Sequence, residues 1–414
     1  MASISPNELA VELLNHCLRG AVWPGDLLDT LVEEAIDEDP AIAAPATRAL
    51  FSVLIERLAD LFEPRLCGVY ARLFARVIEL ARPEIGTAEA LAARYDEVRA
   101  VRPPAFEPET VLVPSRVTLG ADIAVTSLVL DAAKQRFPGA RILFAAPAKS
   151  WELFEKDPRL THLPLRYGRG ALLRDRLAVF EELREAAAAP GTLVLDPDSR
   201  LTQLGLLPIC EARRHHLFES RGFGGEGLET LPALTARWLR QTLGVEDVVP
   251  YLHPRYHYEP ASTPLVTVSF GVGENPAKRV EDPFEEEVLR HLAGLEAQVM
   301  VDLGAPGSEE EERVECALGA LGEAAGRIGV HRGSFASFAA LIASSSFYFG
   351  YDSAGQHVAA ALGVPLLSIF QGMASARMAA RWRPDSPGPV TVLHAGGFQD
   401  VQDLLGAVRH AIRP

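Results

Sequence analysis

A short run of small and polar residues between an apolar stretch and a helical stretch is the part of the sequence best suited to chemistry. In the segment Phe347–Gln371, an apolar run ends at Tyr351, and the turn Asp352-Ser353-Ala354-Gly355 leads into a helix expected from about His357. Backbone N–H groups at such a turn and helix start have no partner within the helix, and the helix dipole adds positive potential. The pattern is therefore typical of an anion site that suits a diphosphate, to which Ser353 adds a hydroxyl and His357 a ring N–H.

A purely structural interpretation of the same turn stays open. Asp352 or Ser353 can cap the helix, Gly355 can supply the turn, and His357 can be a buried histidine with satisfied hydrogen bonds. Residue types alone do not separate this interpretation from an anion site.

Alternating strands and helices are expected to position this turn. From Val111 on, short β-branched runs alternate with amphipathic stretches, which predicts parallel sheets covered by helices on both faces. Ligands bind such sheets outside the carboxyl ends of the strands. The expected strands are 111–113, 141–146, 192–195, 265–270, 298–303, 347–350, 365–370 and 390–393. The expected helices are 123–137, 172–187, 283–295, 309–325, 335–343, 357–362 and 401–412.

The chain divides into three expected domains. Residues 5–102 carry only helical patterns, beginning with the capping box Ser5-Pro6-Asn7-Glu8. A proline-rich linker follows at Pro103–Pro108, and Gly244–Pro264 is a second stretch without periodicity. We therefore expect a small helical bundle at 1–105, a first Rossmann-like domain at 106–250 and a second at 251–414, with the ligand crevice between the last two.

Composition excludes several classes of function. The formal net charge is −15, and residues 1–100 alone hold 17 acidic and 9 basic residues, so neither nucleic acid nor an anionic membrane surface is an expected partner. Cys17, Cys67, Cys210 and Cys316 stand far apart and show neither metal-ligand spacing nor a disulfide framework. No apolar run reaches the ~18 residues of a membrane span, and the start lacks the pattern of a secretion signal. We expect a soluble cytoplasmic protein that binds no metal.

The segment 347–371 resembles the C-terminal nucleotide-binding motif of glycosyltransferase family 9, the ADP-heptose:lipopolysaccharide heptosyltransferases. That motif reads Asp-Ser/Thr-Gly-x-x-His, followed by a helix of small residues and by Gly-x-Pro, which here is Gly363-Val364-Pro365. The resemblance extends over about residues 110–400 and implies a GT-B architecture of two facing Rossmann-like domains. It also implies that the donor nucleotide sugar is bound by Asp352, Ser353, Ala354, Gly355 and His357.

Two other loops resemble donor-binding segments of the family. In GVGENPAKR, residues 271–279, Lys278 corresponds to the lysine that contacts donor phosphate, although a solvated lysine before a helix is the alternative. In LGAPGSEE, residues 303–310, Glu309 or Glu310 corresponds to the acidic residue that contacts the nucleoside and would accept hydrogen bonds from ribose hydroxyls. A helix N-terminus attracts acidic residues through its dipole alone, so the role of these glutamates stays open at this point.

The stretch 111–130 resembles the opening strand of the family and its Arg-x-Ser-x-x-Gly-Asp loop. The spacing from Arg116 to Asp122 equals that of the family, which implies that Arg116 helps to bind the donor and that Asp122 is the catalytic base. Transfer with inversion needs such a base, because the acceptor hydroxyl loses its proton as its oxygen attacks the anomeric carbon. The alternative is that Asp122 only caps its helix. The sequence departs from the family here, since Ala121 stands where the family has glycine and Gly120 precedes it.

The resemblance implies an inverting, metal-independent glycosyltransferase that moves a sugar, most simply heptose from ADP-heptose, to a hydroxyl group. It implies no cofactor beyond this substrate, and it suggests lipopolysaccharide biosynthesis, with a glycan, a lipid-linked saccharide or a protein as acceptor. A nucleotide-sugar epimerase or hydrolase of the same architecture stays open, as does a non-catalytic nucleotide-sugar-binding scaffold protein. The resemblance does not cover residues 1–105, which we expect to select the acceptor or to mediate partner or self-association, and whose deletion should leave donor binding intact.

Overall fold

Helices fill the first part of the chain, as the sequence predicts. The computed structural model describes residues 4–168, 170–259, 263–273 and 275–412. Ser5 caps the first helix, because its hydroxyl accepts a hydrogen bond from the N–H of Glu8 while the Glu8 carboxylate accepts one from the N–H of Ser5. The segments are α1 (Pro6–Leu18), α2 (Gly25–Ala35), α3 (Pro40–Arg48), the π-helical η1 (Ala49–Ile55), α4 (Glu56–Asp60), α5 (Pro64–Ala81) and α6 (Ala88–Val98).

A five-stranded parallel sheet follows, with the strand order β3-β2-β1-β4-β5. Its strands are β1 (Thr110–Pro114), β2 (Arg141–Ala146), β3 (Leu160–Pro164), β4 (Thr192–Asp196) and β5 (His215–Leu217). Its helical segments are α7 (Leu119–Ala121), η2 (Asp122–Thr126), α8 (Ser127–Arg136), α9 (Ala148–Trp151), α10 (Leu173–Ala186), η3 (Ala212–Arg214) and α11 (Leu231–Leu243).

The second sheet has six parallel strands in the order β11-β10-β9-β6-β7-β8. Its strands are β6 (Leu265–Ser269), β7 (Gln298–Asp302), β8 (Ile328–His331), β9 (Phe347–Tyr351), β10 (Leu366–Phe370) and β11 (Val390–His394). Its helical segments are η4 (Pro276–Lys278), α12 (Phe284–Ala293), α13 (Glu309–Ala320), η5 (Gly322–Arg327), α14 (Phe335–Ala343), α15 (Ala354–Ala361), α16 (Ala376–Trp382), η6 (Ala395–Gly397) and α17 (Val401–Ala411).

The predicted fold class, two Rossmann-like parallel sheets after a helical region, is confirmed. The expected strands are all present, but β3, β5 and β8 were not expected, and α15 begins at Ala354 rather than near His357. In the described parts of Gly244–Pro264 there is no helix or strand, and residues 260–262 of this stretch lie outside the described residues. No helix among the described residues combines the length and the apolar character needed to cross a membrane.

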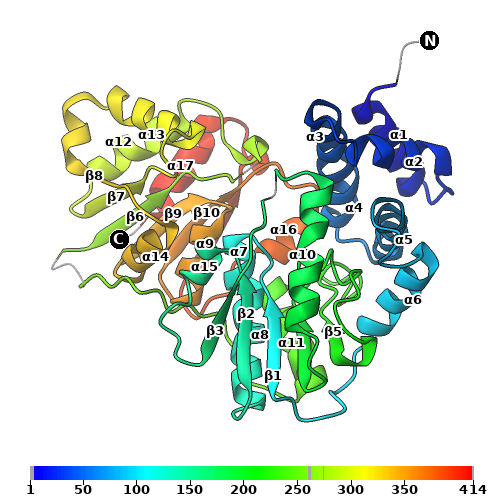
Figure 1. Cartoon of the computed structure of the whole chain (residues 1–414). Coiled ribbons are helices and arrows are strands. Elements are labelled where there is room, and N and C mark those ends of the chain that lie inside the picture. The colour runs from blue at the N-terminus through cyan, green and yellow to red at the C-terminus, as the bar shows by residue number, and fades with distance from the viewer. Residues whose placement is uncertain (1–3, 169, 260–262, 274, 413–414) are drawn as a thin grey trace.

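The N-terminal helices lie beside the first sheet and its loops rather than apart from them (Figure 1). One hydrophobic cluster contains Leu13 and Tyr70 from these helices together with Leu112 and Leu177 from the first sheet and its covering helix. Polar contacts cross the same boundary; for example, Arg94 donates hydrogen bonds to backbone carbonyls of the loop before β5. The first sheet and the helices therefore share one core, and the division of the chain into domains at residues 105 and 250 stays a prediction.

Candidate functional site

The crevice of the second sheet lies where its strand order reverses. The chain runs from β6 through β7 to β8 on one side and then returns to β9 and continues to β11 on the other. In open α/β sheets of this order, ligands bind outside the carboxyl ends of the two central strands. Those strands are β6 and β9, so the turn that follows β9 occupies the expected position for a ligand-binding turn.

The helix after that turn presents its N-terminus to this crevice. Ser353 is the N-cap of α15, and among the described residues its side chain makes no capping hydrogen bond to the helix. Gly355 is required by packing, because a Cβ there would lie 2.1 Å from the hydroxyl oxygen of Tyr348. This glycine stands one position after the glycine of the family motif, and the ring of Tyr348 beneath it explains its place. Ser353 and Ala354 remain part-exposed above this ring, where the first N–H groups of the helix can meet an anion.

A lysine stands at the same helix N-terminus. The Nζ atom of Lys278 donates to the backbone carbonyl of Asp352 at 3.0 Å and pairs with its carboxylate at 2.5 Å. The other carboxylate oxygen accepts a hydrogen bond from Gln356, whose own amide oxygen accepts one from Ser368. Asp352 therefore holds the ammonium group of Lys278 over the turn, and the helix dipole adds to this positive charge.

His357 is neutral and packed between the two halves of the molecule. Burial lowers the pKa of His357 to about 4. Its ring packs edge-on against Trp382 with centroids 5.8 Å apart. On the side of the first sheet, a Cβ on Gly120 would lie 3.0 Å from the His357 ring and 3.3 Å from the Cα of Ala354. The glycine of α7 therefore allows the loop after β1 to touch the N-terminus of α15.

Asp122, the predicted base, is fully buried beside this contact. Its carboxylate accepts hydrogen bonds from the Ser115 hydroxyl at 2.7 Å, the Arg116 N–H at 2.8 Å and the Thr126 hydroxyl at 2.8 Å. Burial raises the pKa of Asp122, and these hydrogen bonds oppose the shift. All three partners belong to the first half of the molecule. These hydrogen bonds do not test the role of Asp122 as a base, which stays a prediction.

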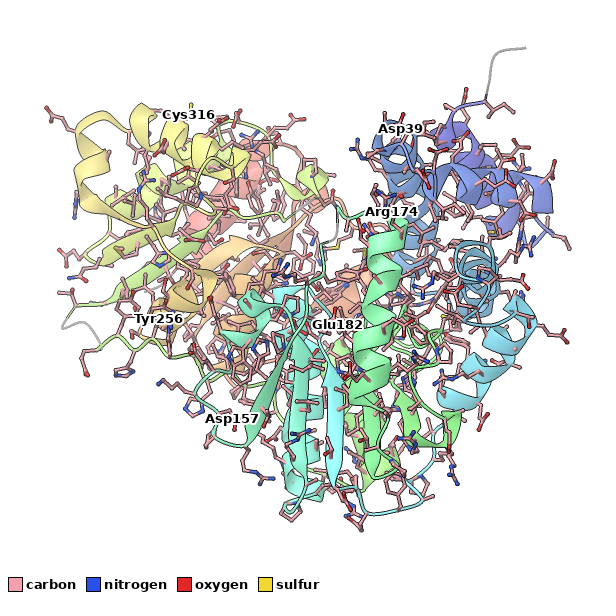
Figure 2. The ribbon with its side chains drawn as sticks, viewed as in Figure 1. Asp39, Asp157, Arg174, Glu182, Tyr256 and Cys316 are labelled. Atoms are coloured by element: carbon pink, nitrogen blue, oxygen red, sulfur yellow. The ribbon has the colours of Figure 1, made fainter. Side chains whose placement is uncertain are left out.

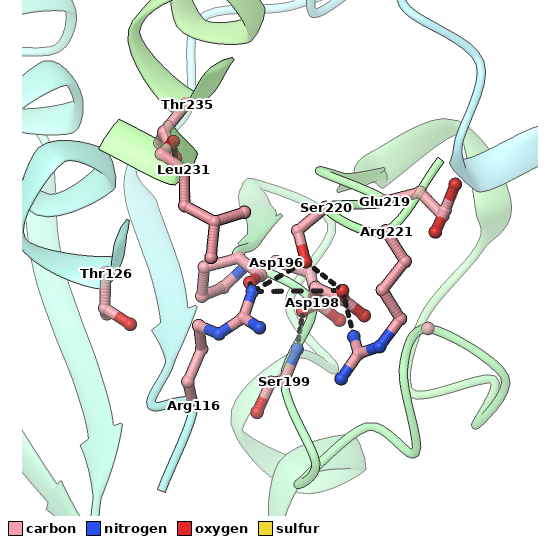
Figure 3. A network of polar contacts seen from close by, with 12 residues as sticks. Arg116, Thr126, Asp196, Asp198, Ser199, Glu219, Ser220, Arg221, Leu231 and Thr235 are labelled. Carbon is pink, nitrogen blue, oxygen red and sulfur yellow. Dashed lines mark hydrogen bonds and ion pairs between the residues drawn. The ribbon is translucent and has the colours of Figure 1, made fainter. Parts of the chain in front are cut away.

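The Arg116 side chain reaches into the loops after β4 and β5 (Figure 3). Its guanidinium donates to the carbonyl of Pro197 at 2.7 Å and to the hydroxyl of Ser220 at 3.1 Å. It also lies 3.8 Å from the carboxylate of Asp198, which pairs with Arg221. The structure thus places Arg116 in a buried network of the first half, and its contribution to donor binding stays a prediction.

The two candidate glutamates differ in their surroundings. Glu309 is exposed, whereas the Glu310 carboxylate lies against the backbone at the carboxyl ends of β6 and β7. A Cβ on Gly271 would stand 2.9 Å from one Glu310 oxygen, and a Cβ on Gly304 would stand 2.9 Å from the other. Burial, with the nearby charge of Asp302, raises the pKa of Glu310 to about 7. Glu310 is therefore the glutamate that the structure brings to the crevice.

A second polar chain at this edge was not anticipated from the sequence. The Asp302 carboxylate at the end of β7 lies 2.8 Å from Nδ1 of His331, and Nε2 of His331 lies 2.7 Å from the Ser337 hydroxyl. Asp302 and His331 are far apart in sequence, and the pairing of β7 with β8 brings them together. In the described part of the chain, no three histidine, cysteine or carboxylate side chains gather as a metal site would require.

The comparisons with known proteins bear on this half of the molecule. Residues 264–386 match the family model described as glycosyltransferase family 9 (heptosyltransferase). The second half carries a glycosyltransferase family 9 domain. The family recognised from the sequence is thereby confirmed for this part of the chain. Lys278, Glu310 and the turn before α15 lie within this family 9 domain, whereas Arg116 and Asp122 precede it.

Solved structures of the family share the fold. A family 9 glycosyltransferase from Veillonella parvula DSM 2008 is 16% identical, with a TM-score of 0.52, over 71% of this chain and 89% of its own. The E. coli heptosyltransferase WaaC, solved with ADP, is 17% identical, with a TM-score of 0.51, over 73% of this chain and 98% of its own. No curated protein matches the chain in sequence. At these identities, the likeness shows the GT-B fold of the family 9 enzymes.

Proposed function

We propose that the chain is an inverting, metal-independent glycosyltransferase that moves a sugar from a nucleoside diphosphate to a hydroxyl group. The observation that carries the proposal is the Lys278–Asp352 pair at the N-terminus of α15, in the crevice of a family 9 domain. As the bond between the anomeric carbon and the diphosphate breaks, negative charge grows on the leaving diphosphate. The Lys278 ammonium group and the N–H groups of Ala354 and Gly355 would stabilise that charge.

We propose ADP-heptose as the simplest donor. The family model is described by heptosyl transfer, and the E. coli relative was solved with ADP. Glu310 would accept hydrogen bonds from the ribose hydroxyls, because its carboxylate reaches the ends of β6 and β7 beside the turn. Ser353 would add a hydroxyl to the diphosphate site.

We propose Asp122 as the base that takes the proton of the acceptor hydroxyl while that oxygen attacks the anomeric carbon. Its raised pKa makes the carboxylate a better proton acceptor than an exposed aspartate. Because Asp122 is fully buried beside the contact of α7 with α15, the acceptor must reach it through a separation of these two segments. The acceptor would be a glycan, a lipid-linked saccharide as in lipopolysaccharide synthesis, or a protein. The free cysteines favour a reducing, cytoplasmic setting.

The full burial of Asp122 also favours a second candidate, a non-catalytic protein that binds a nucleotide sugar. Calorimetry of the full chain with ADP, UDP, GDP and ADP-heptose tests the binding site that both candidates share. We expect ADP and ADP-heptose to bind, and binding of none of the four would overturn the proposed function. Release of ADP from ADP-heptose in the presence of an acceptor panel then supports the transferase. Release without any acceptor identifies a hydrolase, and bound but unchanged donor identifies the binding protein.

A further inference from the structure

The turn between α4 and α5 places a phenylalanine in a different hydrophobic cluster from the leucines on either side of it. Phe62, between α4 and α5, is 1% exposed and has a backbone φ of 52°. The left-handed region is costly for a bulky side chain and persists only where the surroundings enforce it. Phe62 belongs to the hydrophobic cluster that includes Trp238 of the first half and Tyr348 of the second, whereas Leu58 and Leu66 on either side of it belong to the cluster shared with the first sheet.

Hydrogen bonds tie the backbone of this turn to the second half. The hydroxyl of Ser375, the N-cap of α16, donates to the carbonyl of Leu61 at 3.3 Å. The guanidinium of Arg377 on α16 donates to the carbonyl of Phe62 at 2.9 Å. The same arginine pairs with Glu226, in the glycine-rich loop after β5. The turn thus connects the N-terminal helices directly with α16.

Helix α16 is also anchored to the first half through a buried arginine. Arg381 is 0% exposed and donates to the carbonyls of Gly225 and Glu229, each at 3.2 Å. Because the N-terminal helices share a core with the first sheet, the turn and the glycine-rich loop hold α16 from the same body. Helix α16 is therefore fixed against the first half although it belongs to the second.

From α16, two contacts lead to the donor site. Trp382 at its end packs edge-on against His357. The loop before it passes so close to the Lys278 segment that a Cβ on Gly372 would lie 2.5 Å from the carbonyl of Ala277. A displacement of α16 would therefore move both the ring beside the α15 N-terminus and the backbone that carries the lysine.

We infer that Phe62 is a positioning residue for donor binding, which acts through α16 on His357 and Lys278. By filling the cluster between the halves, its ring keeps the first half, with the N-terminal helices, closed against the second. The N-terminal helices thereby control the affinity of a site whose proposed residues, Lys278, Glu310 and the turn before α15, all belong to the second half. This inference rests on the proposed donor site.

Phe62→Ala tests it, with Phe74→Ala as the matched control. Phe74 is a buried phenylalanine of the same helical region, but it packs in the cluster shared with the first sheet and against Phe51. Both variants lose one buried ring, so a general loss of stability affects both. In calorimetry of the full chain with ADP, we expect Phe62→Ala to weaken binding at least about fivefold, and Phe74→Ala less than about twofold. Equal affinities for Phe62→Ala and the wild type would overturn the inference.

A milder pair of variants covers the case in which Phe62→Ala does not fold. Arg377→Gln removes the guanidinium that holds the Phe62 carbonyl, and Glu226→Gln removes only the 77%-exposed partner of the same arginine. We expect Arg377→Gln to weaken ADP binding and Glu226→Gln to leave it unchanged, since an exposed ion pair contributes little. The same affinity loss in both would overturn the role of the turn.

A distance measurement separates this inference from the proposed function, because it needs no ligand. Cys316 on α13 is exposed, and Glu182→Cys on α10 supplies a second exposed label position, with Cys210→Ser to avoid labelling the loop before β5 (Figure 2). By pulsed electron spin resonance, Phe62→Ala should broaden the distance distribution between the labels, and Phe74→Ala should not. An unchanged distribution in Phe62→Ala would overturn the inference even if ADP binds. Failure of the wild type to bind any of ADP, UDP, GDP and ADP-heptose would instead overturn the proposed function.

Discussion

Glu310 offers the sharpest test of the site, because one substitution should change stability and binding in opposite directions. Burial raises the pKa of Glu310 from 4.5 to about 7. A carboxyl whose pKa is raised by folding favours the folded state below pH 4.5, and this advantage is lost as the pH rises through 7. The shift corresponds to about 3 kcal/mol of unfavourable free energy for the ionised form at pH 8. The side chain is part-exposed, so the measured effect should be about 1–3 kcal/mol.

Glu310→Gln removes that charge with little change in shape. We expect the variant to be more stable than the wild type at pH 8, and the difference to vanish near pH 4.5. At pH 8 it should also bind ADP about 10- to 100-fold more weakly, because hydrogen bonds from the ribose hydroxyls to a carboxylate contribute about 1.5–3 kcal/mol. A residue that lowers stability while it supports binding is characteristic of a functional site.

Thermal unfolding at pH 4.5 and pH 8, with calorimetry at pH 8, measures both effects. Glu309→Gln is the matched control, since it removes the same charge from the exposed neighbour on the same helix. The control should change neither stability nor binding. If the two variants behave alike, or if Glu310→Gln lowers stability at pH 8, the placement of Glu310 at the ribose is refuted.

Three further predictions concern the rest of the site. Asp122→Asn should abolish sugar transfer in a coupled assay of ADP release while ADP binding by calorimetry persists; unchanged turnover would remove Asp122 as the base. Lys278→Met should weaken ADP binding at least about tenfold. Lys149→Met, at an exposed position, should change ADP affinity by less than about twofold. Equal effects of the two substitutions would argue against the anion site at Lys278. Gly120→Val should lower the midpoint of thermal unfolding and weaken ADP binding, because a side chain there collides with α15 at a cost of about 1–3 kcal/mol. Gly139→Val is the control, since the space around a Cβ at that position is open. Equal midpoints for the two variants would show that the contact between α7 and α15 accommodates a side chain without strain.

The strands that the sequence did not predict have a common physical cause. β3, β5 and β8 each lie at an edge of their sheet. An edge strand is covered less completely, so its residues need not form the continuous apolar run that marks a central parallel strand. In β3 the side chains vary from buried to exposed, and β5 has only three residues, two of them histidines. The central strands, which carry the site, were all predicted.

The site itself was predictable where its parts are neighbours in sequence. The turn before α15 combines its N-cap, its small residues and its glycine within four positions, so local chemistry identified it. The choice of Glu310 over Glu309 depends on how α13 is rotated against β6 and β7, and four consecutive glutamates carry no periodic signal of that rotation. The contacts of Gly120 and Trp382 with His357 join segments from three parts of the chain. No pattern within a single sequence predicts such contacts.

The shared core also revises the expectation for residues 1–105. Deleting them would expose Leu112, Leu177 and the other side chains of the first sheet that these helices cover. Loss of that burial destabilises the first half by itself, so donor affinity after deletion would not report on acceptor selection. Single substitutions within the helices are the better means of testing their role.

The core that the N-terminal helices share with the first sheet can be completed only late in the synthesis of the first half. The cluster that covers the N-terminal helices is completed only by Leu217 on β5. At a synthesis rate of roughly 5–20 residues per second, the roughly 120 residues between α6 and that strand take about 6–24 s to appear. Through that interval the apolar faces of α1, α2 and α5 are made but not fully covered. Nascent chains of intermediate length should therefore be the ones that chaperones bind, while the family 9 domain, made last, folds against a first half that is already complete.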